Sequence, residues 1–86
     1  MAEYYFYDGD KDMGFHGYTS EKDVIRSAMS YATEHPRRYI GVYINQRFGG
    51  YFLGRVYIGS DKGRKVAKFK TENGNYILNR DGTIRK

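Results

Sequence analysis

Tyrosine and basic side chains recur along two β-rich segments in the middle of the chain. Residues 39–44 and 51–58 are joined by a glycine-containing loop, which is typical of a β-hairpin. Aromatic rings can stack on nucleic-acid bases, and lysine and arginine neutralise phosphates. The candidate binding face consists of Tyr39, Tyr43, Tyr51, Arg55 and Tyr57, flanked by Lys68 and Lys70. This combination predicts a platform for single-stranded nucleic acid or a nucleotide.

Strict alternation assigns each side chain of the hairpin to one of two faces. It places Phe52 with Val56 on an aliphatic face, and Tyr51 and Leu53 with Arg55 on the tyrosine face. A structural interpretation of the same pattern is that the tyrosines pack as cross-strand ladders or close a small barrel, with the lysines solvating an edge. The pattern alone leaves both interpretations open.

A second group of cations lies in the expected turns and at the strand ends. Its members are Arg37, Arg38, Arg47, Lys62, Arg64 and Lys65. Such turns could hold phosphates, with the backbone amides of Gly49, Gly50 and Gly63 close to the phosphate oxygens. The simpler interpretation is that the basic turns are solvated and the glycines supply positive φ angles. Phosphate binding would make the affinity fall steeply with salt.

The acidic segment 8–12 has alternating aspartates, as at the start of a calcium-binding loop. Met13 stands where such a loop needs glycine, and Thr19 stands where it needs a bidentate glutamate. We therefore expect a solvated acidic turn, with neither a metal nor another cofactor.

The two histidines do not form a catalytic pattern. His16 falls in an expected loop, and His35 lies at the end of an expected helix, where a cation suits the helix dipole. Neither metal-ligand spacing nor a nucleophile–base arrangement is present in the sequence. We expect a protein that is not an enzyme.

The elements that would position these residues follow from local signals. Ser20 is a good N-cap, an apolar stripe follows at helical spacing, and Pro36 should end the helix near Glu34. Segment 8–18 has no periodicity and is expected to be a loop. Strands are expected at 3–7, 39–44, 51–58, 64–71 and 76–78, with a short last one at 83–85.

The predicted order is therefore β-α-β-β-β-β with a short last strand, in a single α+β domain covering residues 1–86. One helix should pack on one face of a mostly antiparallel, strongly curved sheet. The tyrosine face would then be the one that the helix does not cover.

Composition narrows the class of protein further. The 86 residues contain no cysteine, so disulfides and thiolate metal sites are excluded. The sequence shows neither a signal peptide nor an apolar run of about 20 residues, so we expect a cytoplasmic protein with no membrane partner. Residues 1–36 carry a net charge of −4 and residues 37–86 carry +9. A concentrated positive field of this kind favours polyanionic partners.

Two classes of function fit these observations. The first is a small binding protein for nucleic acid or a nucleotide. The alternative is a protein–protein interaction module, such as an inhibitor of a larger host partner encoded by a bacteriophage or mobile element, because tyrosine and arginine are also enriched at protein interfaces. A homodimer formed through an uncovered sheet face or edge is compatible with either class.

Overall fold

The computed structural model describes residues 3–46 and 49–85 of the chain. In chain order the elements are β1 (Glu3–Asp8), β2 (Met13–Tyr18), α1 (Glu21–Glu34), β3 (Ile40–Gln46), β4 (Gly49–Asp61), β5 (Arg64–Thr71) and β6 (Gly74–Ile77). The order is thus β-β-α-β-β-β-β. The predicted α+β class is confirmed, with one helix packed against one antiparallel sheet.

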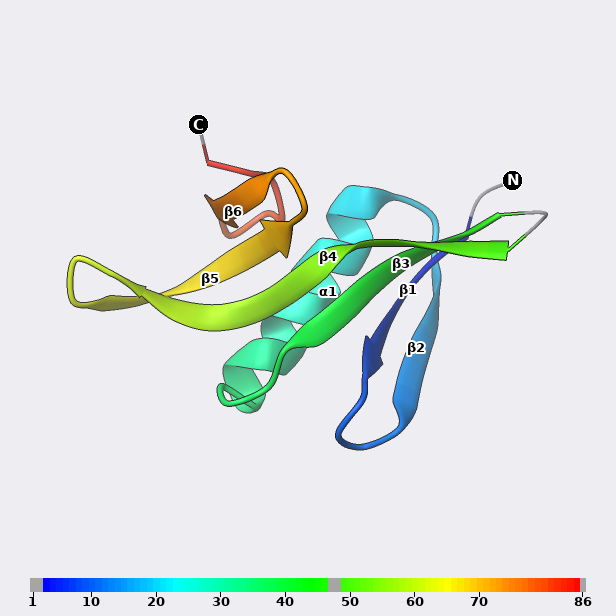
Figure 1. Cartoon of the computed structure of the whole chain (residues 1–86), viewed down its shortest axis with the longest axis horizontal. Helices are drawn as coiled ribbons and strands as arrows, with labels where there is room; N and C mark the ends of the chain where they lie inside the picture. The colour runs from blue at the N-terminus through cyan, green and yellow to red at the C-terminus, as the bar shows by residue number, and fades with distance from the viewer. Residues whose placement is uncertain (1–2, 47–48, 86) are drawn as a thin grey trace.

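The six strands form a single antiparallel sheet in the order β2-β1-β3-β4-β5-β6. The sheet is not closed into a barrel. Helix α1 lies against one face, and the twisted β4–β5 hairpin extends beyond the helix (Figure 1). The opposite face carries no other element of the described chain.

Helix α1 begins and ends where the local signals predict. The Ser20 hydroxyl oxygen accepts a hydrogen bond from the backbone N–H of Asp23 at 3.1 Å, which satisfies one of the first-turn amides. The helix ends at Glu34, with His35 as its C-cap directly before Pro36. Within the described residues, no helix combines the length and apolarity needed to cross a membrane.

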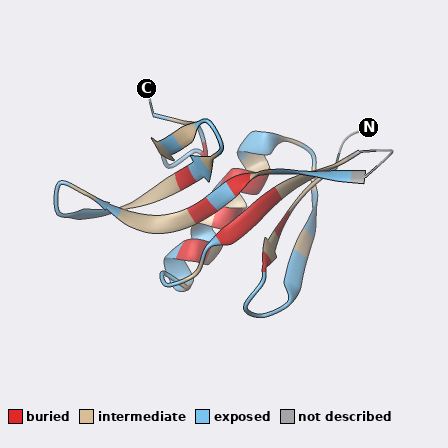
Figure 2. Ribbon diagram, in the orientation of Figure 1, coloured by how far each residue is buried: buried red, intermediate tan, exposed pale blue. Residues whose placement is uncertain are grey.

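The hydrophobic core lies between α1 and the sheet (Figure 2). The helix contributes Val24, Ile25, Ala28 and Ala32, and the sheet side contributes Phe6, Ile40, Val42, Val56, Phe69 and Leu78. These residues recur at helical spacing in α1 and at alternate positions in the strands. The core therefore follows from the apolar periodicity of each element.

The loop predicted for residues 8–18 is wrong in its second half, which forms the edge strand β2. Asp12 adopts a positive φ of 51° and closes the turn after β1. Phe15 then packs its ring 4.6 Å from that of Phe6. A bulge at Gly17, whose φ is 98°, interrupts the alternation of β2. That interruption explains why the segment shows no strand periodicity.

A second bulge changes the faces of β4. Val42 pairs with Gly54 and Tyr43 pairs with Phe52, so Leu53 is an extra residue in β4. Phe52 therefore shares a face with Tyr43, whereas Leu53 packs against the core. The predicted aliphatic-face position of Phe52 and tyrosine-face position of Leu53 are wrong, because strict alternation assumed an unbulged strand.

The predicted last strand at residues 83–85 is reduced to a single bridge between Leu78 and Ile84. The C-terminal segment folds back so that Arg85 N donates to the carbonyl oxygen of Ile77 at 2.8 Å. Gly82 turns the segment with a φ of 91°. A Cβ atom at Gly82 would lie 2.6 Å from the carbonyl oxygen of Lys22, so only glycine allows this close approach to α1.

Candidate nucleic-acid interface

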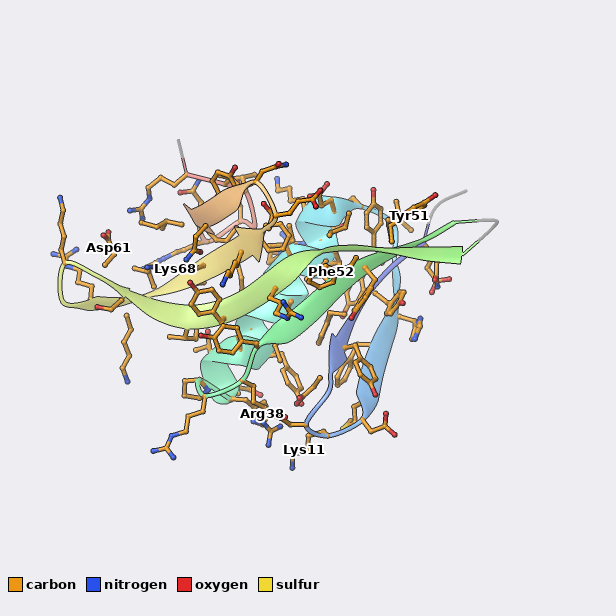
Figure 3. All side chains as sticks on the ribbon, in the orientation of Figure 1. Lys11, Arg38, Tyr51, Phe52, Asp61 and Lys68 are labelled. Atoms are coloured by element: carbon orange, nitrogen blue, oxygen red, sulfur yellow. The ribbon has the colours of Figure 1, made fainter. Side chains whose placement is uncertain are left out.

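The face of the sheet opposite α1, hereafter the open face, gathers most of the described aromatic residues outside the core. Strand alternation and cross-strand pairing place there Tyr5, Tyr7, His16, Tyr39, Tyr43, Phe52 and Tyr57 together with Arg55, Lys68 and Lys70. Figure 3 shows Phe52 and Lys68 among the side chains of this sheet. The open face is therefore both aromatic and basic.

Four rings form a continuous row across four strands of the open face. His16 stacks on Tyr5 with a centroid distance of 4.7 Å, and Tyr5 stacks on Tyr43 at 4.9 Å with an interplanar angle of 9°. Tyr43 contacts Phe52 in a tilted arrangement at 5.4 Å. The guanidinium carbon of Arg55 lies 4.9 Å from the centroid of the Phe52 ring. We call these four rings the aromatic row.

The rings of the aromatic row cover much of one another's stacking surface. Both faces of the Tyr5 ring are covered, by His16 on one side and Tyr43 on the other. This is the cross-strand ladder that the sequence left open as a structural interpretation. A ligand base would therefore meet hydroxyls and ring edges along the middle of the row, and ring surface at its Phe52 end, where 47% of that residue is exposed.

A separate pair of tyrosines lies next to the row. Tyr39 stacks on Tyr57 with centroids 4.7 Å apart and an interplanar angle of 21°. The side-chain amide of Asn75 donates a hydrogen bond to the Tyr57 hydroxyl oxygen at 2.5 Å. Tyr57 is thus fixed on two sides, while Tyr39 remains 58% exposed. Tyr39 offers the second accessible ring of the open face.

The cations of the open face alternate with these rings. Arg55 lies directly opposite Lys70, and Tyr57 lies directly opposite Lys68. Directly paired cross-strand residues are about 5 Å apart, so Lys68 borders Tyr57, and Arg55 lies over the Phe52 ring. Among the ion pairs of residues 3–46 and 49–85, none involves Arg55, Lys68 or Lys70. Their charge is available to an anionic ligand.

Arg38 does not join this face. Its guanidinium donates a hydrogen bond of 2.7 Å to the buried carboxylate of Asp8, which also accepts one from the Tyr31 hydroxyl. Burial acts to raise the pKa of Asp8, but the hydrogen bonds from Tyr31 and Arg38 outweigh it and hold that pKa below its usual range. Arg38 therefore has a structural partner, and its predicted phosphate-binding role has no geometric support.

The other predicted site residues are distributed over several places. Tyr51 pairs with Ile44 and so belongs to the helix side of the sheet, contrary to the prediction from alternation. Arg64 lies next to the β4–β5 turn opposite Asp61, and Lys65 lies opposite Ser60. Arg47 lies outside the described residues.

The acidic segment 8–12 does not converge on one point. Asp8 turns toward α1, whereas Asp12 accepts a hydrogen bond from the Tyr7 hydroxyl, which raises the pKa of Tyr7. In the described part of the chain, His, Cys, Asp and Glu do not gather in a group of three or more that could hold a metal ion.

Sequence reasoning missed four members of the open face: Tyr5, Tyr7, His16 and Phe52. Tyr5 and Tyr7 could have been found, since they alternate with Phe6 in a segment already predicted to be a strand. His16 and Phe52 each lie beside a bulge, and a bulge is specified by pairing with the neighbouring strand rather than by local periodicity.

No protein-family model, curated protein or solved structure matches this chain. The inference of function therefore rests on the geometry of the open face, where exposed rings lie beside cations on the side of the sheet that α1 does not cover.

Proposed function

We propose that the open face binds single-stranded nucleic acid. The observation that carries this proposal is the position of Arg55 over the exposed Phe52 ring and of Lys68 opposite Tyr57, on which the exposed Tyr39 ring stacks. Arg55, Lys68 and Lys70 have no acidic partner among the described residues. Cations that border ring surface can hold the phosphates while the rings receive the bases. Each stacked base contributes about 1–3 kcal/mol to binding.

The geometry favours single strands over duplex. Bases stack on protein rings only when they are unpaired and turned outward. Phe52 and Tyr39 present ring surface, whereas the Tyr5 and Tyr43 rings are held in the aromatic row. A rigid platform of this kind loses little side-chain entropy on binding, which favours association. The same features would accept a nucleotide.

A protein partner is the second candidate, supported by the exposed fractions of the large side chains. Met13, Tyr39, Tyr51 and Phe52 are each between 45% and 60% exposed. Exposed tyrosines beside an arginine are typical of binding hot spots. Since Tyr51 lies on the helix side and Phe52 on the open face, an interface that includes both would have to contact both faces of β4.

The test is a fluorescence-anisotropy titration of the full chain against labelled single-stranded DNA, single-stranded RNA and duplex at two salt concentrations. We expect single strands to bind more tightly than duplex and more weakly at higher salt. The variant Arg55→Gln/Lys68→Gln/Lys70→Gln should lose at least tenfold in affinity. The slope of log affinity against log salt concentration should decrease in magnitude by about 2, since three phosphate contacts are removed and each contributes about 0.7 for single strands.

The matched control removes the same charge from the other side of the sheet, in Lys65→Gln/Arg80→Gln/Arg85→Gln. Its affinity should decrease much less than that of the open-face variant. Equal losses in the two variants would show a response to net charge alone and contradict the proposed site. Absence of binding to all three nucleic acids would direct the search to the protein partner.

A further inference from the structure

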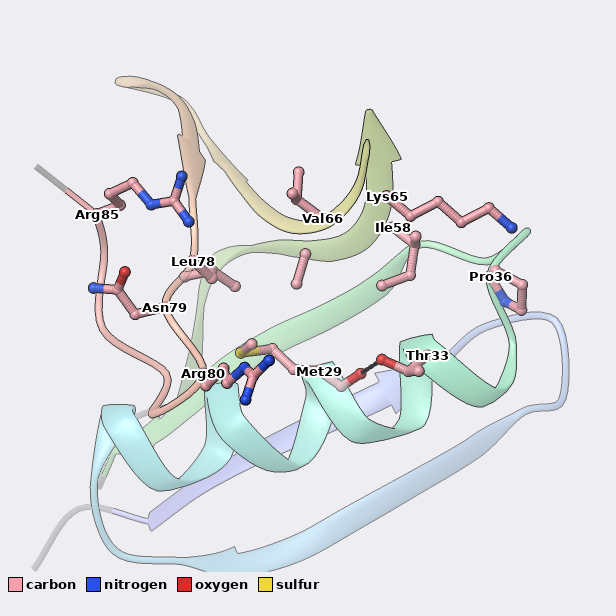
Figure 4. Close-up of a pocket in the computed structure, with 11 residues that line it drawn as sticks. Met29, Thr33, Pro36, Ile58, Lys65, Val66, Leu78, Asn79, Arg80 and Arg85 are labelled. Carbon is pink, nitrogen blue, oxygen red and sulfur yellow. Dashed lines mark hydrogen bonds between the residues drawn. The ribbon is translucent and has the colours of Figure 1, made fainter. Parts of the chain in front are cut away.

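A cavity of about 560 Å³ lies on the helix side of the sheet, where the β4–β5 hairpin extends past α1 (Figure 4). Its apolar lining comes from Met29 of α1, Ile58 of β4, Ala67 of β5 and Leu78, which follows β6. These residues belong to the core or pack against it. A cavity of this volume is in the range of small-molecule sites.

The charged residues that line the cavity are all cations. They are Lys65 from β5 and Arg80 and Arg85 from the C-terminal segment, and no aspartate or glutamate of the described residues lines the cavity. Arg80 and Arg85 lie at one end with Asn79, and Lys65 lies at the other end (Figure 4). Among residues 3–46 and 49–85, none of the three cations takes part in an ion pair.

The backbone that carries the two arginines is held in place. Asn79 N donates to the carbonyl oxygen of Thr83 at 2.8 Å, and Arg85 N donates to that of Ile77 at 2.8 Å. The Leu78–Ile84 bridge lies between these bonds. Because these backbone hydrogen bonds already fix the segment, ligand binding would cost little conformational entropy there.

We propose that this cavity binds a small organic anion with a linear apolar body, of which a medium-chain carboxylate is the simplest example. The carboxylate would pair with one of the two arginines at that end of the cavity, since guanidinium groups match carboxylates well. The chain would lie on Met29, Ile58 and Leu78, where each buried methylene increases affinity roughly three- to fourfold. The site is separate from the open face and does not depend on nucleic-acid binding.

The test is a titration of the full chain with octanoate, followed by the NMR signals of the Met29, Ile58 and Leu78 methyl groups. We expect a saturable shift of these three signals. The alcohol 1-octanol, which has the same chain length and no charge, should bind at least tenfold more weakly. Equal affinity for the alcohol and the carboxylate would overturn the anionic specificity.

Two charge variants locate the site. Lys65→Gln/Arg80→Gln/Arg85→Gln should weaken octanoate binding at least tenfold, and it should fold because none of its three side chains makes a hydrogen bond or ion pair in the described structure. Arg55→Gln/Lys68→Gln/Lys70→Gln, matched in charge, should bind octanoate within twofold of the unmodified protein. Unchanged binding in the first variant, or no shift of the three methyl signals at millimolar octanoate, would overturn the proposal.

Discussion

The guanidinium of Arg38 donates a hydrogen bond of 2.7 Å to the carboxylate of Asp8, which lies 30 residues earlier in the chain. The Tyr31 hydroxyl donates to the same carboxylate oxygen at 2.5 Å, and the backbone N–H of Asp10 donates to the other oxygen at 3.1 Å. Asp8 is only 1% exposed. One buried carboxylate thus ties the end of β1 to α1 and to the residue directly before Tyr39 of the open face.

Removing the charge of Asp8 should destabilise the fold. In Asp8→Asn the Arg38 guanidinium, whose side chain is 23% exposed, loses its charged partner, and the loss of a charge-assisted hydrogen bond costs about 1.5–3 kcal/mol of unfolding free energy. Urea denaturation measures this change. The control Asp10→Asn removes a carboxylate that is 74% exposed and 3.9 Å from Arg38, and should cost less than about 1 kcal/mol. Equal effects of the two substitutions would contradict the role of Asp8.

The stability of the protein should depend on pH through Asp8. Its pKa in the folded state lies below the usual range because hydrogen bonds from Tyr31 and Arg38 outweigh the effect of burial. The resulting stabilisation is present above the unfolded pKa, near about 3.9, and is lost as the pH falls through the lowered folded value. The unfolding free energy, measured by denaturation at pH values from 7 to 2, should therefore fall less steeply with decreasing pH for Asp8→Asn than for the unmodified protein. Parallel pH profiles would show that Asp8 is not the group responsible.

The aromatic row should stabilise the sheet. Tyr43→Ala removes the ring that contacts both Tyr5 and Phe52, and should lower the unfolding free energy by about 2 kcal/mol. Tyr51→Ala, which truncates a tyrosine that is 60% exposed, should change it by less than about 0.5 kcal/mol. Thermal or urea unfolding of both variants measures the difference. If Tyr51→Ala lowered the unfolding free energy more than Tyr43→Ala, the assignment of Tyr43 to the aromatic row and of Tyr51 to an exposed position would be wrong.

The backbone of β4 should not tolerate a side chain at Gly54. A Cβ atom there would lie 2.7 Å from the carbonyl oxygen of Lys70 and 2.8 Å from the ring of Phe69. We expect Gly54→Ala to cost about 1–3 kcal/mol through overpacking. Gly9→Ala is the control, since the nearest atom to its Cβ is in a tyrosine ring 3.9 Å away. Urea denaturation of both variants measures the difference. If Gly54→Ala were as stable as Gly9→Ala, the strands would be able to move apart at Gly54 without loss of stability.

The bulge at Leu53 makes a prediction about binding that differs from strict alternation. Because Phe52 lies on the open face and Tyr51 does not, Phe52→Ala should weaken single-strand binding by about 1–3 kcal/mol and Tyr51→Ala should leave it nearly unchanged. Anisotropy titrations of the two variants at one salt concentration decide the question. Strict alternation would give the reverse ranking.

The sequence by itself determined the features that depend on local interactions. The Ser20 cap, the apolar stripe of α1 and the turn at Gly74 follow from residues within a few positions of one another. These signals were sufficient to predict an α+β fold with a helix on one side of an antiparallel sheet. Strand alternation further predicted a face with Tyr39, Tyr43, Tyr51, Arg55 and Tyr57, flanked by Lys68 and Lys70, of which Tyr51 was misplaced.

Only the tertiary structure decided which rings and cations belong to which face. The bulges at Gly17 and Leu53 arise from pairing with β1 and β3, so they bring His16 and Phe52 to the open face and move Tyr51 away from it. Arg38 pairs with Asp8, and Lys65 lines the same cavity as Arg80 and Arg85, only when segments distant in the chain are packed together. The physical reason is that local periodicity fixes the alternation within a strand, whereas the register between strands and the partners of long charged side chains are set by contacts between distant parts of the chain.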